Sequence, residues 1–140
     1  MALQESTLDT KASPEAVWRI WSAPETWPEW NPDVTAISLD GPLAAGARGS
    51  MTTKRGGTHQ VTIESVEPGR SFWLVSGGLP GHQLAFRCQV LPSGGGSRVS
   101  QGVDIRGPLG GLLSGMMGRK IAQSFEPILR ALAARAEAAG

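Results

Sequence analysis

The sequence predicts a single α+β domain in which a seven-stranded antiparallel sheet packs against a long C-terminal helix. Two patterns carry this prediction. Between Val34 and Arg106, apolar and polar residues alternate and turn residues recur at short intervals, as in an antiparallel meander. From residue 109 onward, the apolar spacing becomes that of a helix with one apolar face. The chain of 140 residues is close to the commonest domain size, so we expect one domain over residues 1–140.

The N-terminal segment predicts a strand followed by a helix. Residues 3–10 alternate loosely and form the first expected strand. Ser13 can cap a helix, and Pro14 suits the first helical turn, where its missing N–H would have had no partner. The apolar residues that then share one helical face are Val17, Ile20 and Trp21.

A second short helix is expected at Pro24. Pro24 and Glu25 restart a helical turn, which we expect the Trp27-Pro28 and Asn31-Pro32 pairs to end. The reason is that a residue before proline is pushed out of the α region. The first strand is therefore followed by two short helices.

Six further strands follow, joined by short turns rich in glycine and proline. They are expected at residues 34–39, 48–54, 58–67, 70–76, 82–91 and 97–106. Alternation separates an apolar face from a polar face, although residues 70–76 are apolar on both parities. The residues expected to face the C-terminal helix are Leu84, Phe86, Val90, Val99, Val103 and Ile105. Those expected to face water are Arg87, Arg98 and Asp104.

The last helix is expected within residues 109–139. Its apolar face collects Leu113, Met117, Ile121, Ser124, Phe125, Ile128 and Leu132. Pro127 removes the amide that would bond to the Gln123 carbonyl and crowds that carbonyl. We therefore predict a bend near residues 123–127, which would help the helix to follow a curved sheet.

Composition argues against several kinds of function. Thirteen Lys and Arg oppose 12 Asp and Glu, and the basic residues are scattered, so we expect no nucleic acid partner. No segment approaches the ~20 apolar residues that a membrane helix needs, and no leader is evident, so we expect a cytoplasmic protein without a membrane span. One cysteine and two histidines without a ligand motif predict no metal and no cofactor. No catalytic motif is present, so the catalytic residues are unknown and enzyme activity stays open.

The opening of the chain resembles a known family. Residues 12–18 read ASPEAVW and are followed by Trp21, Trp27, Pro28, Trp30, Asn31 and Pro32. With the order of elements, this segment resembles the bacterial polyketide cyclase/dehydrase-type proteins of the START-like, Bet v 1-like (SRPBCC) superfamily. The resemblance covers the whole chain and implies a helix-grip fold, in which a curved sheet wraps around the C-terminal helix and leaves an apolar cavity. It says less about function, because the superfamily includes ligand carriers, hormone receptors, aromatase/cyclases and co-chaperone-like modules.

The leading hypothesis is that the cavity binds a small hydrophobic molecule, such as a lipid, a polyketide or another apolar ring compound. The expected ligand-binding residues are Trp30, His59, Phe72, Phe86, Val99, Gln101, Val103, Leu113, Met117, Ile121 and Phe125. Two alternatives stay open. One is a polyketide cyclase/dehydrase-type enzyme acting in the same cavity, and the other is a co-chaperone-like module that binds a protein partner. The protein is expected to be a monomer or a homodimer.

Three polar residues on the expected inner face have two interpretations each. Gln101 lies mid-strand among apolar residues, where an unpaired amide is costly, so its partner is either protein or ligand. His59 could move a proton at a bound carbonyl, or it could sit half-exposed at a strand end. Cys88 is expected to be a small buried apolar residue, with a reactive thiol as the alternative.

Overall fold

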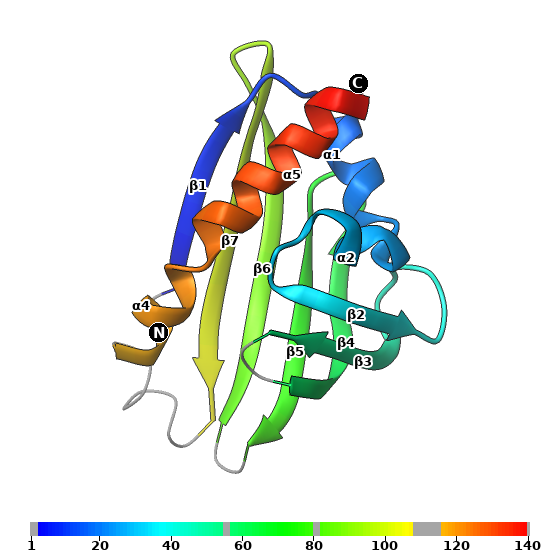
Figure 1. Ribbon diagram of the computed structural model, residues 1–140, viewed down its shortest axis with the longest axis vertical. Helices are drawn as coiled ribbons and strands as arrows, with labels where there is room; N and C mark the ends of the chain where they lie inside the picture. Colours follow the sequence, from blue (N-terminus) through cyan, green and yellow to red (C-terminus); the bar gives the residue numbers. More distant parts are fainter. Residues whose placement is uncertain (1–2, 55–56, 80–81, 108–115, 140) are drawn as a thin grey trace.

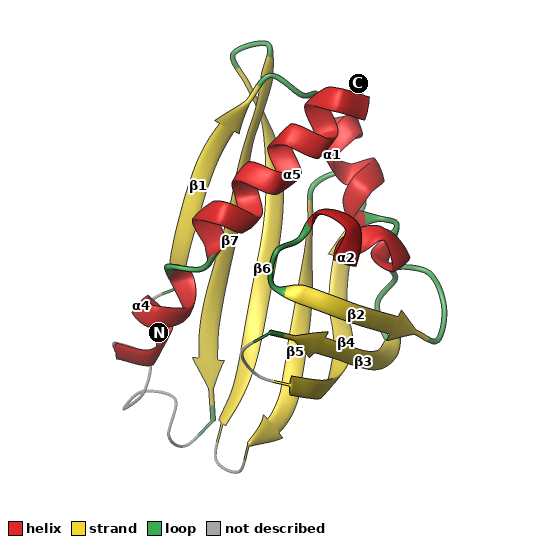
Figure 2. Ribbon diagram, in the orientation of Figure 1, coloured by secondary structure: helices red, strands yellow, loops and turns green. Residues whose placement is uncertain are grey.

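The predicted antiparallel sheet is confirmed in the computed structural model, which describes residues 3–54, 57–79, 82–107 and 116–139. Its seven strands are all antiparallel to their neighbours, in the order β1-β7-β6-β5-β4-β3-β2. The sheet is curved, and the helices lie on one side of it (Figures 1 and 2). The strands are β1 (Gln4–Thr10), β2 (Val34–Leu39), β3 (Arg48–Thr53), β4 (Gly57–Glu67), β5 (Ser71–Leu79), β6 (His82–Ser93) and β7 (Gly96–Arg106).

The hairpin of β6 and β7 sets which residues of these two long strands share a face. Gly94 and Gly95 form its turn with φ angles of 54° and 87°. Two successive positive φ angles are required by the tight turns that match the twist of a hairpin. The resulting register places Gln101 beside Cys88. Because side chains alternate between faces, this register brings the two residues onto the same inner surface.

The paired short helices follow β1, as predicted. They are α1 (Pro14–Trp21), the 3₁₀ turn η1 (Pro24–Thr26) and α2 (Trp27–Trp30). The Ser13 hydroxyl caps α1 by accepting a hydrogen bond from the Ala16 amide at 3.1 Å. α2 ends at Asn31, whose backbone is extended, as the following proline requires.

One detail of the prediction was wrong. Trp27-Pro28 does not end the helical turn, because Trp27 keeps helical backbone angles of φ −55° and ψ −40°. Pro28 occupies the first turn of α2, where its missing N–H needs no partner. The preference of a residue before proline for extended structure is therefore overridden here.

The predicted bend in the C-terminal helix is confirmed as a break. α4 (Met116–Ala122) ends and α5 (Phe125–Ala139) begins, with Gln123 and Ser124 between them. The Ser124 amide donates to the Ile121 carbonyl at 3.0 Å, a tightened turn that ends α4. Pro127 then lies in the first turn of α5, where it costs no helical hydrogen bond. Within the described residues, no helix is long and apolar enough to cross a membrane.

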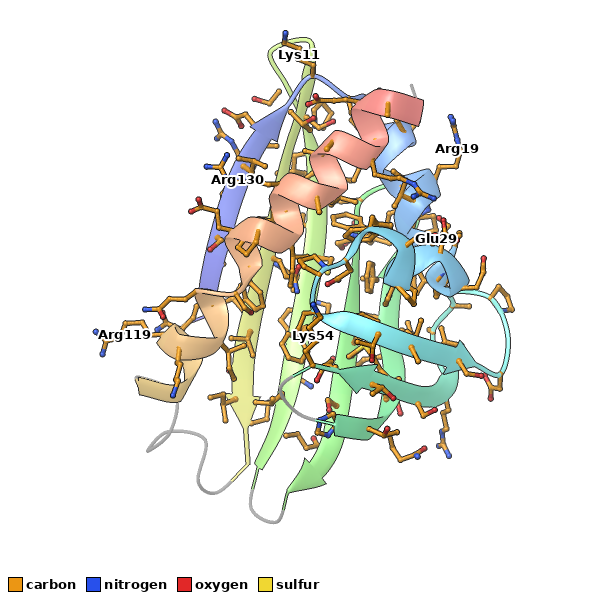
Figure 3. The ribbon with its side chains drawn as sticks, in the orientation of Figure 1. Lys11, Arg19, Glu29, Lys54, Arg119 and Arg130 are labelled. Atoms are coloured by element: carbon orange, nitrogen blue, oxygen red, sulfur yellow. The ribbon has the colours of Figure 1, made fainter. Side chains whose placement is uncertain are left out.

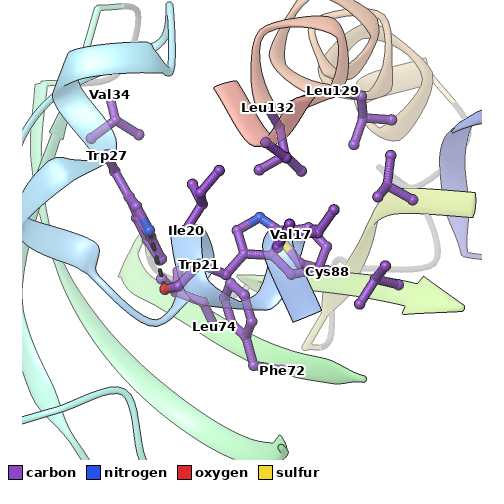
Figure 4. Packing of buried hydrophobic residues seen from close by; sticks show 14 of the residues in the cluster. Val17, Ile20, Trp21, Trp27, Val34, Phe72, Leu74, Cys88, Leu129 and Leu132 are labelled. Carbon is purple, nitrogen blue, oxygen red and sulfur yellow. Dashed lines mark hydrogen bonds between the residues drawn. The ribbon is translucent and has the colours of Figure 1, made fainter. Parts of the chain in front are cut away.

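The predicted faces of the sheet are confirmed. On the inner face, Val99, Val103 and Ile105 are at most 1% exposed and pack under the helices. On the outer face, Arg98 pairs with Asp9 and Arg87 with Glu5. The apolar residues of α5 face inward, and Figure 4 shows Leu129 and Leu132 in the core beside the first helices. The parity of β5 is also resolved, because Phe72 and Leu74 are buried on the inner face.

Gly49 provides a test of this packing. A Cβ at Gly49 would lie 1.7 Å from the Ser38 carbonyl oxygen of β2, whereas a Cβ at Gly77 of β5 would meet nothing within 4 Å. We predict that Gly49→Ala lowers the free energy of unfolding by about 1–3 kcal/mol, because β2 must separate from β3. Gly77→Ala, the matched control, should change it by less than about 0.5 kcal/mol. Urea denaturation measures both, and equal effects would contradict this packing.

Candidate ligand pocket

A pocket of about 320 Å³ lies between the inner face of the sheet, the short helices and the junction of α4 with α5. Most of its wall is apolar, and six of the lining side chains are tryptophan or phenylalanine. The lining residues are Trp21, Trp27, Trp30, Asn31, Asp33, Val34, Met51, Thr53, His59, Phe72, Leu74, Ser76, Leu84, Phe86, Cys88, Gln101, Ile121, Ser124, Phe125 and Ile128. A concave, mostly apolar pocket with a few polar groups is the usual form of a small-molecule site.

Aromatic rings hold one end of the pocket in place. Trp27 stacks on Phe72 with ring centroids 5.8 Å apart, and Trp21 meets Phe72 edge-on at 5.7 Å. The Trp27 indole N–H donates to the Trp21 carbonyl at 3.2 Å, the bond that Figure 4 draws as a dashed line. Phe86 and Phe125, which also line the pocket, meet edge-on at 6.2 Å. These contacts give the wall few alternative conformations.

The Trp30 indole has a different environment. Its side chain packs against the buried apolar residues of the core and also lines the pocket. Its Nε1 is buried, and no hydrogen-bond partner for it is found within the described residues. A buried N–H without a partner carries a free-energy cost.

Gln101 provides an amide in the middle of the wall. Its strand neighbours are Ser6 of β1 and Cys88 of β6. The Ser6 hydroxyl donates to the Ala122 carbonyl at 3.4 Å, and the Ser124 hydroxyl donates to the Ile121 carbonyl at 2.7 Å. These nearby hydroxyl protons are therefore directed to the helix backbone, and no residue in the described ranges hydrogen-bonds to the Gln101 side chain.

A second group of polar residues comes from the turn before β2 and from β4. The Asn31 side-chain oxygen accepts hydrogen bonds from the Asp33 and Val34 amides at 2.9 and 3.3 Å. This turn brings half-buried Asp33 to the wall of the pocket. His59, half-buried on β4, also lines the pocket and pairs in register with Met51.

Cys88 is buried in the wall, as expected. Burial raises the pKa of its thiol to about 12, because the thiolate would lose its hydration. The thiol therefore stays protonated at neutral pH. A protonated, buried thiol is a weak nucleophile, so Cys88 acts here as an apolar wall residue.

The structure brings seven of the eleven predicted ligand-binding residues to this pocket: Trp30, His59, Phe72, Phe86, Gln101, Ile121 and Phe125. Val99 and Val103 lie on the same face but are packed in the core, at 0% and 1% exposed. Leu113 and the side chain of Met117 lie outside the described residues. The part that each of these residues takes in ligand binding stays a prediction.

Several wall residues were not predicted from the sequence. Leu74 and Ser76 share the strand parity of Phe72, so alternation was a signal that could have found them. Leu84 was expected on the inner face but not as a ligand-binding residue. Asp33 had no such signal. Its position depends on the Asn31 turn and on the curvature of the sheet, which only the folded chain shows.

Comparisons with known proteins place the chain among proteins of this fold. The family model described as "Polyketide cyclase / dehydrase and lipid transport" matches residues 1–137. No curated protein sequence matches the chain.

Solved structures show the same fold at low sequence identity. A START superfamily protein from Mycobacterium smegmatis is 19% identical, with a TM-score of 0.71 and 99% of both chains covered. A truncated norcoclaurine synthase from Thalictrum flavum is 14% identical, with a TM-score of 0.69, 94% of this chain and 91% of that chain covered. The di-domain ARO/CYC StfQ from the steffimycin biosynthetic pathway is 17% identical, with a TM-score of 0.72, and the match covers 95% of this chain and 49% of that one.

The environment of Cys88 predicts a dependence of stability on pH. Above pH 9.0, the ordinary pKa of a thiol, the unfolded chain loses this proton, while the folded chain keeps it up to about pH 12. The free energy of unfolding should therefore fall between these pH values, by at most about 1.4 kcal/mol per pH unit from this group. Urea denaturation of wild type and Cys88→Ala measures the effect, and the variant should lack this contribution. Equal slopes in the two proteins would contradict the burial of the thiol.

Proposed function

Because its family model matches residues 1–137, the chain belongs to the polyketide cyclase / dehydrase and lipid transport family, and we propose that it binds a small hydrophobic molecule in the pocket described above. The ligand is a lipid, a polyketide or another apolar ring compound. The observation that carries this proposal is an apolar pocket of about 320 Å³, walled by three tryptophans and three phenylalanines. Such a wall excludes water and offers flat aromatic surfaces to an apolar ring.

Chemistry on the bound molecule is the second candidate function. It is favoured by His59, which lines the pocket, since an imidazole beside a bound carbonyl transfers protons near neutral pH. Two of the similar structures, a norcoclaurine synthase and an ARO/CYC protein, are named after reactions. The binding function does not depend on this step.

Filling the pocket tests the binding function. Ser76 lines the pocket, so the larger side chain in Ser76→Leu should occupy free space. We predict that it weakens binding of the neutral fluorescent probe 1-aminoanthracene by about ten-fold or more while the domain stays folded. Val103 is packed in the core, so Val103→Phe, the control, should lower the free energy of unfolding by about 1–3 kcal/mol. Fluorescence titration and urea denaturation measure the two effects. If Ser76→Leu destabilises the domain as much as Val103→Phe does and probe binding persists, the space is packed core and the probe binds elsewhere.

Proton transfer by His59 is tested with a simple ring ketone. We predict that the protein accelerates exchange of the α-hydrogens of 2-tetralone with D₂O, and that His59→Gln lowers the rate by about a hundred-fold or more. ¹H NMR follows the exchange, with 1-aminoanthracene binding showing that the variant pocket is intact. Equal exchange rates for wild type and variant would remove His59 as a proton-transfer group.

A further inference from the structure

We propose that the pocket selects electrically neutral ring compounds that carry a hydrogen-bonding oxygen, and that Gln101 and Asp33 set this selectivity. The inference rests on the proposed binding function and adds the chemical class of the ligand. It depends on two features of the wall. One is an amide without a protein partner among the described residues, and the other is a carboxylate that forms no ion pair with them.

The amide of Gln101 requires a polar partner. It lies on the inner face of β7, lines the pocket and has no hydrogen-bond partner within the described residues. The side chain is half-buried, so solvent reaches its amide in the free protein. A ligand that displaces this solvent without offering an oxygen leaves the amide unpaired in apolar surroundings, which costs free energy, whereas a ligand oxygen can accept from its NH₂ group. A ketone, phenol or alcohol supplies such an oxygen, and a pure hydrocarbon does not. The amide therefore favours an oxygen-bearing ligand over a hydrocarbon of the same shape.

The charge of the wall argues against an acidic ligand. Asp33 is the one Asp, Glu, Lys or Arg among the described residues that line the pocket. No ion pair joins Asp33 to any Lys or Arg in the described ranges. Its carboxylate therefore gives the wall a negative charge. The backbone N–H of Lys54 donates to the Asp33 carbonyl at 2.9 Å, but the Lys54 side chain is exposed and forms no ion pair with the Asp33 carboxylate.

The arginines of the described sheet that form ion pairs do so outside the pocket. Arg87 pairs with Glu5 at 2.7 Å and Arg98 with Asp9 at 2.9 Å, on the outer face. Figure 3 shows basic side chains such as Lys11, Arg19 and Arg119 reaching outward at the edges of the molecule. These groups are not among the residues that line the pocket.

A bound carboxylate would therefore lose its hydration without gaining a cation from the described wall. Burying an unpaired anion is far more costly than burying a neutral polar group, and the like charge of Asp33 adds repulsion. A neutral molecule avoids both costs. The pocket should accordingly reject free fatty acids and other carboxylates, and accept neutral ketones, phenols and alcohols of ring compounds.

Four compounds with one three-ring skeleton test this selectivity by displacement of 1-aminoanthracene. They are fluorene, 9-fluorenone, fluorene-9-carboxamide and fluorene-9-carboxylate. Relative to wild type, Gln101→Met should reduce the preference for fluorenone over fluorene by about five-fold or more, because it keeps the side-chain length and removes the amide. Asp33→Asn should reduce the preference for the carboxamide over the carboxylate by about ten-fold. Because each preference is compared between variant and wild type, the different hydration of the compounds in water cancels.

Matched variants outside the pocket serve as controls. Gln89→Met, on the strand parity opposite to Cys88, and Asp9→Asn, on the outer face, should leave both preferences unchanged. If wild type binds the carboxylate as tightly as the carboxamide, or if Gln101→Met leaves the preference for fluorenone unchanged, the inference is overturned while the binding function stands. It is likewise overturned if 1-aminoanthracene binds but no compound displaces it. If neither the probe nor any of the four compounds binds, the proposed function itself fails.

Discussion

The packing of three tryptophan rings on Phe72 is the interaction on which the rest of the pocket depends. Trp18, Trp21 and Trp27 surround this ring with centroids 5.7–6.3 Å away, and together they attach the short helices to β5. The hydrogen bond from Trp27 to the Trp21 carbonyl then joins the two helices to each other. Because these rings are large and stiff, they hold α2 as a rim above the curved sheet. The broken C-terminal helix covers the rest of the inner face, and the pocket remains between the helix and the sheet.

The elements and their faces could be predicted from the sequence because they depend on local chemistry. Alternation along β7 separates Val99 and Val103 from Arg98, and a register set by a two-glycine turn preserves that separation in the folded sheet. Pro127 predicts the break in the last helix for an equally local reason, since it cannot donate the bond that a continuous helix needs. The family resemblance then supplied the curvature of the sheet and the expectation of a cavity.

The pocket wall was less predictable, because it depends on how distant elements meet. Gln101 and Val103 share one face of β7, yet the path of the helices leaves Gln101 at the pocket and buries Val103 in the core. Asp33 reaches the wall only because the Asn31 turn and the curvature of the sheet carry it there. A period-two pattern cannot separate a residue that lines a space from one that fills it. The polarity of the pocket, on which the proposed class of ligand rests, is therefore seen only in the folded chain.

The tryptophans offer the most direct measurement of whether this pocket holds a ligand. Trp21, Trp27 and Trp30 line it, whereas Trp73 lies on the outer face, where the Arg106 guanidinium is 5.4 Å from its ring centroid. Each indole N–H gives its own signal in a ¹H–¹⁵N NMR spectrum, and single Trp→Phe variants assign them. On titration with 9-fluorenone, a ligand-binding pocket predicts that the signals of Trp21, Trp27 and Trp30 move while that of Trp73 stays in place. Equal movement of Trp73, or no movement of the three pocket signals, would contradict binding at this site.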